Sequence, residues 1–140
     1  MNKTQSYNKI KWVDTHCHLQ LLDERLEIDN FQNIEFLIIP GVDFESSLKA
    51  KEISSEIELE TYWSAGLHPH DAKLLNSQRE SLNKLFQEAD LIGETGLDFY
   101  RNLSTKEEQI ENFLHHLNFS KQLDKPIIIH CRDSFQDTYD

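Results

Sequence analysis

Five short apolar runs alternate with longer polar or amphipathic stretches along the chain. The runs cover residues 11–19 (KWVDTHCHL), 34–42 (IEFLIIPGV), 61–68 (TYWSAGLH), 91–99 (LIGETGLDF) and 126–131 (PIIIHC). Near-continuous apolar runs bounded by Gly, Pro or Asp are typical of strands buried on both faces, as in a parallel sheet. The pattern therefore predicts five parallel strands.

The stretches between these runs are predicted to be helical where they are long enough. Asp43 and Ser46 offer N-caps for a first helix. Its apolar residues are Leu48, Ile53 and Ile57. A second helix carries apolar residues at helical spacing, namely Leu82, Leu85, Phe86 and Ala89. The connection over residues 21–33 is expected to hold at most a short helix.

A further helix begins at a capping box, because Glu108 follows three residues after Thr105. Pro126 follows this helix as a stop signal. The predicted apolar stripe consists of Ile110, Phe113, Leu114 and Leu117. His115 and His116 are adjacent in this helix, so at least one is expected to face solvent, and neither is assigned a function.

Alternating strands and helices with a parallel sheet indicate an α/β fold. The chain has no internal repeat, low-complexity segment or linker, so residues 1–140 are predicted to form a single domain. A (β/α)₈ barrel and an open, doubly wound sheet both remain possible, because both place polar functional residues at the carboxyl ends of the strands.

Net charge, the lack of long apolar stretches and the number of cysteines argue against several classes of protein. A formal net charge of -11 argues against a basic surface that grips nucleic acid nonspecifically, although bound cations would still allow a phosphate substrate. No stretch approaches the ~20 apolar residues of a membrane helix, and the opening residues do not resemble a signal peptide, so a cytoplasmic location is expected. Cys17 and Cys131 are too few for a disulfide framework and are expected to be reduced, buried thiols.

The residues with metal-binding or catalytic chemistry recur where predicted strands end. His16 and His18 lie two apart in the first strand, where alternation would direct both rings to one metal ion, and Asp14 could orient one of them. The alternative is a pair of hydrogen-bonded structural histidines. Glu94 lies in an apolar strand between glycines, and a buried carboxylate is costly unless it binds a cation or pairs with Arg101 or Arg132.

The other candidate site residues also lie at or just after the ends of predicted strands. His130 ends the most apolar strand, and Arg132 two residues later could hold a substrate phosphate. His68 and His70 flank a turn and could face the substrate, or could be turn histidines with backbone partners. Asp98 could contact substrate, support a ligand or cap a turn.

Together and in this order, these motifs resemble the TatD family of metal-dependent deoxyribonucleases. The matching stretches are VDTHCHL, PGV, GLHPH, IGETGLDFY and KPIIIHCRDSFQDT, which run from Val13 to Thr138. Their order and spacing are more specific than any single motif. Two small departures are Thr95, where the family usually has an apolar residue, and the shortened segment 21–33.

The resemblance implies a (β/α)₈ TIM-type barrel, of which this chain supplies roughly the first five β/α units. It also implies two divalent metal ions (Mg²⁺, Mn²⁺ or Zn²⁺) and hydrolysis of phosphodiester bonds in a DNA substrate. His16 and His18 would hold one ion, Glu94 would bridge both as a catalytic residue, and His130 would hold the other. Two further ligands expected of the family, a histidine after the sixth strand and an aspartate after the eighth, lie outside these 140 residues.

Three alternatives remain at the level of sequence. Amidohydrolases and histidinol-phosphatase-like phosphoesterases also begin with an H-x-H motif and act on amides or small phosphoesters. Paired-metal amidohydrolases commonly bridge the ions with a modified lysine of the fourth strand, where this chain has Glu94. A non-enzymatic alternative is an N-terminal fragment that binds metal weakly or needs a complementing C-terminal segment.

Overall fold

A computed structural model describes residues 10–22 and 33–140 of the chain. In chain order the elements are β1 (Trp12–Asp14), η1 (Leu19–Leu21), β2 (Ile34–Ile39), α1 (Phe44–Glu56), β3 (Thr61–Ala65), η3 (Pro69–Leu74), α2 (Leu75–Glu88), β4 (Leu91–Asp98), α3 (Lys106–Leu123), β5 (Ile127–Arg132) and α4 (Phe135–Tyr139). The predicted first connection includes residues 23–32, which lie outside the described residues. None of the described helices has the length and apolar character needed to cross a membrane.

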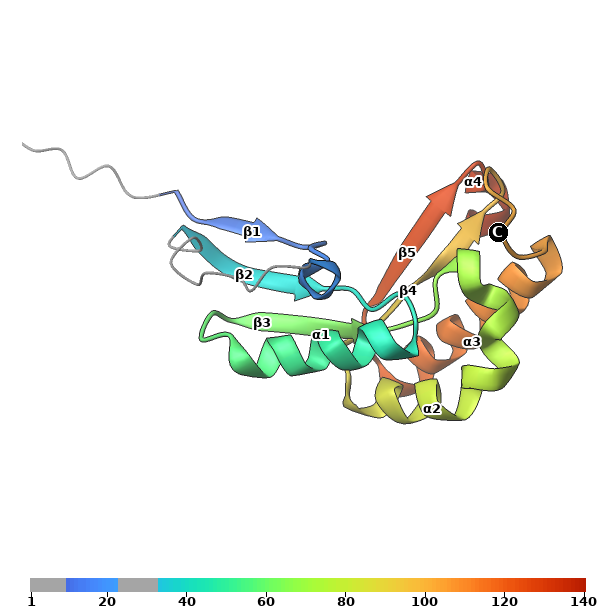
Figure 1. The fold of residues 1–140 in the computed structure, drawn as a ribbon. Helices are drawn as coiled ribbons and strands as arrows, with labels where there is room; N and C mark the ends of the chain where they lie inside the picture. The colour runs from blue at the N-terminus through green and yellow to red at the C-terminus, as the bar shows by residue number, and fades with distance from the viewer. Residues whose placement is uncertain (1–9, 23–32) are drawn as a thin grey trace, which may run out of the picture.

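All five strands are parallel, and their spatial order β1-β2-β3-β4-β5 is the order of the sequence. In Figure 1 the sheet curls between β3 and β4, and α1, α2 and α3 gather on one side of it. A doubly wound sheet would reverse its strand order and carry helices on both faces. The curled sheet with sequential strands is part of a (β/α)₈ barrel, so the predicted fold is confirmed with five strands present.

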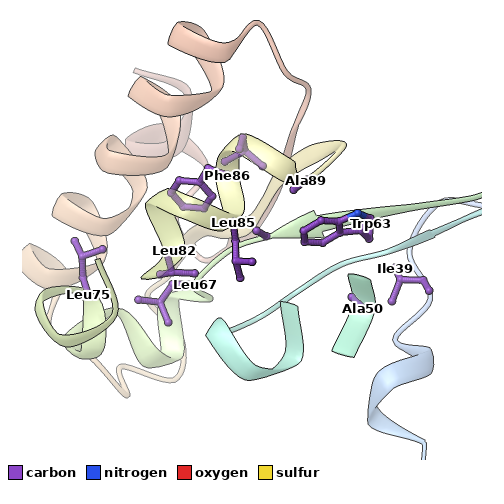
Figure 2. Packing of buried hydrophobic residues seen from close by; sticks show 11 residues of the cluster. Ile39, Ala50, Trp63, Leu67, Leu75, Leu82, Leu85, Phe86 and Ala89 are labelled. Atoms are coloured by element: carbon purple, nitrogen blue, oxygen red, sulfur yellow. The ribbon is translucent and has the colours of Figure 1, made fainter. Parts of the chain in front are cut away.

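The core lies between the sheet and the helices. Leu82, Leu85, Phe86 and Ala89 of the predicted second helix are all buried, and they pack toward Trp63 of β3 (Figure 2). The helix starts are also as predicted. Asp43 caps α1 and Thr105 caps α3, each with a complete capping box.

The buried face of α3 differs from the predicted apolar stripe. Of the four predicted residues only Phe113 is buried, and Leu114 is 53% exposed. The completely buried residues are instead polar: Gln109, Asn112 and His116. Of the two adjacent histidines only His116 is completely buried, whereas His115 is half-buried and so partly faces solvent. The polar face is explained by backbone groups of neighbouring loops, which these side chains satisfy.

The strands are not all buried on both faces. β4 is buried along nearly its whole length, whereas β1 is exposed at every residue and β5 is partly exposed. Within the described residues β1 and β5 each pair on one side only, which leaves the faces near them uncovered. As a result Cys131 is exposed, so the expectation of two buried thiols is wrong for this residue, and Cys17 is only half-buried. Both cysteines are free.

Candidate metal centre

Glu94 lies at the centre of the candidate metal site. It lies on β4 with only 7% of its surface exposed, and its backbone N–H donates to Gly41 O at 2.7 Å. The preceding Gly93 has φ +114°, and a Cβ there would lie 2.5 Å from Ile128 O of β5. Only glycine fits this backbone and this close approach, which brings β5 beside Glu94.

One oxygen of Glu94 faces the two histidines that follow β1. Oε2 lies 3.3 Å from Nε2 of His16 and 3.7 Å from Nε2 of His18. Nδ1 of His18 lies 3.2 Å from Pro40 O. A carbonyl oxygen only accepts, so Nδ1 carries the proton and the Nε2 lone pair is free toward Glu94.

β1 ends at Asp14, before both histidines, so strand alternation does not bring their rings together as predicted. They converge because the chain after β1 turns over the end of the sheet. Asp14 accepts a hydrogen bond from the backbone N–H of His16 at 3.0 Å and does not orient a ring.

The other oxygen of Glu94 faces a second group of histidines. Oε1 lies 3.3 Å from Nδ1 of His130 and 4.0 Å from Nε2 of His68. These two ring nitrogens are 3.1 Å apart. An adjoining cavity of about 270 Å³ is lined by His18, Val42, His68, His70, Asp71 and Glu94.

The residues fit divalent cations. In a tetrahedral site with bonds of ~2.0–2.1 Å, neighbouring ligand atoms lie about 3.3 Å apart. The separations from Glu94 to His16, His18 and His130 are 3.3, 3.7 and 3.3 Å, which is close to this value. Imidazole nitrogens with a carboxylate are the donors that zinc and manganese accept. Within residues 10–22 and 33–140 no arginine pairs with Glu94, so the alternative of a structural ion pair has no support there.

Asp98 is the last residue of β4 and contacts two of the histidines. It is completely buried, and its Oδ2 lies 2.7 Å from Nε2 of His70 and 3.1 Å from Nε2 of His130. Its Oδ1 accepts the backbone N–H groups of Tyr100 and Arg101. Burial alone would raise the pKa of this carboxyl, but the hydrogen bonds from Arg101, His70 and His130 outweigh it and hold the pKa far below its usual range. Of the roles considered for Asp98, this geometry favours ligand support and turn capping over direct substrate contact.

His68 and His70 both lie at the rim of the site, at the start of η3. Burial, followed by the proximity of His130 and His70, lowers the pKa of His68 to about 3, so the ring is neutral at pH 7. Arg132 lies apart from this cluster. Its guanidinium is exposed and stacks over the ring of Tyr100 at 3.9 Å.

Sequence reasoning missed the polar side chains of α3 that hold the loops of the site. Gln109 accepts the N–H of Asp98 and donates to its carbonyl and to Ser104 O. Asn112 donates to Leu67 O, and His116 accepts the N–H of Leu67, which directly precedes His68. No sequence signal marks these positions, because a polar residue in a helix is ordinarily solvent-exposed.

Comparison with known proteins identifies the family of this chain. The family model described as TatD related DNase matches residues 13–140. The chain belongs to this family. A relative in Escherichia coli K12, the uncharacterized metal-dependent hydrolase YcfH, is 33% identical over 90% of the chain and 51% of its own length. The 3'-5' ssDNA/RNA exonuclease TatD of the same organism is 36% identical over 71% of the chain and 39% of its own length.

Solved structures show the same fold. A TatD family hydrolase from Entamoeba histolytica aligns with TM-score 0.79 at 20% identity, over 93% of this chain and 52% of its own. The TatD homolog YJJV from Escherichia coli aligns with TM-score 0.71 at 22% identity, over 91% and 53%. The chain thus spans about half the length of the relatives that it matches and carries the fold of TatD-family hydrolases.

Proposed function

We propose that this chain carries metal ligands of a hydrolase that cleaves phosphodiester bonds in DNA, with ions bound on both sides of Glu94. The observation that carries the proposal is the position of that carboxylate. One oxygen faces His16 and His18 and the other faces His130, so a single side chain can serve two cations. Two-metal sites of this kind are common in nucleases and phosphatases.

Nucleic acid is the proposed substrate because the TatD relatives with named activity are exonucleases acting on single-stranded DNA or RNA. Bound divalent ions would supply positive charge that polarises the scissile phosphate. Glu94 and the three histidines would hold that charge, and Asp98 would keep His130 oriented. The cavity beside His68 and Glu94 would admit the phosphate. Because the net charge of -11 does not attract nucleic acid, the affinity for the substrate would come from the metal site itself.

The test is the substitution Glu94→Gln, which keeps the volume of the side chain and removes its charge. With Mn²⁺ and single-stranded DNA, we expect cleavage to fall at least ~10²-fold, the scale of losing a principal charge-stabilising group. Glu107→Gln, at an exposed position of α3, is the matched control and should retain activity. Activity of Glu94→Gln within a few-fold of the unmodified protein would refute the proposal, as would hydrolysis that persists in chelator.

Metal binding provides a readout that is independent of turnover. Calorimetric titration of the chain with Zn²⁺ should give saturable binding that Glu94→Gln weakens strongly and Glu107→Gln does not. This measurement also addresses the non-enzymatic alternative, because it detects the metal site whether or not DNA is cleaved. A chain that binds Zn²⁺ but does not cleave DNA would support that alternative.

A further inference from the structure

The ring of His68 is held in one protonation pattern by its own loop. The backbone N–H of His70 donates to Nδ1 of His68 at 3.2 Å. A backbone amide can only donate, so Nδ1 must offer its lone pair. The single proton of the neutral ring therefore lies on Nε2, the nitrogen that faces the metal centre.

The neighbouring groups agree with this assignment. Nε2 of His68 lies 3.1 Å from Nδ1 of His130, so its N–H donates to a lone pair on Nδ1. Nε2 of His130 lies 3.1 Å from Oδ2 of Asp98, a carboxylate that only accepts, which places the proton of His130 on Nε2. In this pattern the lone pair of His130 Nδ1 also faces Oε1 of Glu94 at 3.3 Å, a contact between two acceptors that a bound cation would relieve.

This pattern separates a ligand from a donor. A metal ion needs a nitrogen lone pair, and His130 offers one at Nδ1 while His68 has none at Nε2. Nitrogens of His68, His70 and His130 all lie within 4.8 Å of one another, which by distance alone would suggest a three-histidine metal site. The hydrogen bonds argue against that site, because Nε2 of His70 is likewise 2.7 Å from Asp98 and donates to it.

We propose that His68 is a hydrogen-bond donor with a fixed tautomer. Without metal, its Nε2–H donates to His130 Nδ1. When an ion is bound to His130 Nδ1, the same N–H would donate to a substrate phosphate oxygen. The inference rests on the proposed function. The loop supports it, because both backbone groups of Leu67 are held by buried side chains of α3, at 2.7 Å from Asn112 and 3.1 Å from His116. His68 also lines the cavity into which the N–H would point.

The tautomer can be measured directly by long-range ¹H–¹⁵N NMR of the chain labelled on histidine nitrogens. Without metal, His68 should show a protonated Nε2 and an unprotonated Nδ1, and His130 should show the same pattern. On addition of Zn²⁺, Nδ1 of His130 should shift as a ligand while Nε2 of His68 keeps its proton. A proton on Nδ1 of His68, or a Zn²⁺-coordinated Nε2, would overturn the proposal.

Variants provide a second test, with Zn²⁺ and inorganic phosphate as the probes. His68→Leu should bind Zn²⁺ at least as tightly as the unmodified chain, because a competitor for Nδ1 is gone, whereas His130→Leu should bind it at least ~10-fold more weakly. In the Zn²⁺-loaded protein, His68→Leu should bind phosphate ~10-fold or more weakly, the scale of one hydrogen bond to a charged group. His68→Gln, which keeps an N–H donor, should retain most of that affinity.

The outcomes distinguish this proposal from the proposed function. A chain that binds no Zn²⁺ would refute the metal-dependent function, while the metal-free NMR pattern would still decide the tautomer of His68. A ~10-fold or greater loss of Zn²⁺ affinity in His68→Leu would make His68 a ligand and overturn the inference alone. Unchanged phosphate affinity in that variant would likewise refute its role as a donor.

Discussion

Acidification should destabilise the chain through a single buried histidine of α3. His116 is completely buried, with Nε2 accepting the N–H of Leu67 at 3.1 Å and Nδ1–H donating to Asn112 O at 2.8 Å. Burial lowers the pKa of its imidazole to about 3. A second proton would have to enter at Nε2, directly against the N–H of Leu67, so the folded protein keeps this ring neutral.

The magnitude follows from the two pKa values. In the unfolded chain a histidine titrates near pH 6.5. Between pH 6.5 and about 3, the unfolded state therefore binds a proton at His116 that the folded state does not bind. The contribution of His116 to stability is therefore complete above pH 6.5 and is lost as the pH falls. From pH 7 to pH 5 the loss is about 2 kcal/mol. That is a large share of the ~5–15 kcal/mol that holds a typical domain folded.

The variant His116→Gln isolates this contribution. Glutamine can offer an amide oxygen to the N–H of Leu67 and has no titratable group. Urea unfolding at pH 7 and pH 5, with chelator present, should show the free energy of unfolding falling by about 2 kcal/mol less in the variant than in the unmodified chain. The variant must be compared with the unmodified chain because His68, whose pKa is also about 3, lowers the free energy of unfolding of both proteins on acidification.

His115→Gln is the matched control, because His115 is the half-buried neighbour on the same helix and its pKa is lowered by burial and by Arg79. Its substitution should change the pH dependence less than His116→Gln does. If His116→Gln and the unmodified chain lose the same free energy between pH 7 and pH 5, to within ~0.5 kcal/mol, the buried neutral histidine is not the cause.

Lys125 should stabilise the chain, because its ammonium donates to three carbonyl oxygens at the end of α2. Lys125→Met should lower the free energy of unfolding by about 1–3 kcal/mol in urea titrations, and a loss equal to that of Lys84→Met at an exposed position of α2 would contradict this. Alkylation with iodoacetamide at pH 8 should modify Cys131 well before Cys17, since Cys131 is exposed while burial raises the pKa of Cys17 to about 11. Peptide mass mapping that finds equal rates would show that Cys17 is more accessible than the structure indicates.

The sequence alone predicted the succession of strands and helices, the starts of two helices and the residues that meet in the candidate metal centre. These features are local. A capping box is complete within four residues, as at Asp43 and Thr105, and an apolar run reveals a buried strand such as β4 wherever it packs. The resemblance of the motifs to the TatD family then indicated the barrel, which periodicity alone left undecided between two α/β architectures.

Only the tertiary structure decided which atoms of these residues face each other. Glu94 presents a different oxygen to each group of histidines, and His18 is oriented by Pro40, which directly follows β2. The polar face of α3 and the burial of Asp98 have the same origin. Their partners lie far along the chain: Asn112 and His116 bond to the backbone of Leu67, and Asp98 bonds to the side chains of His70 and His130. Hydrogen bonds of this kind depend on how the chain packs and follow no periodic sequence pattern. The side chains that hold the site residues in place can therefore be identified only in the folded protein.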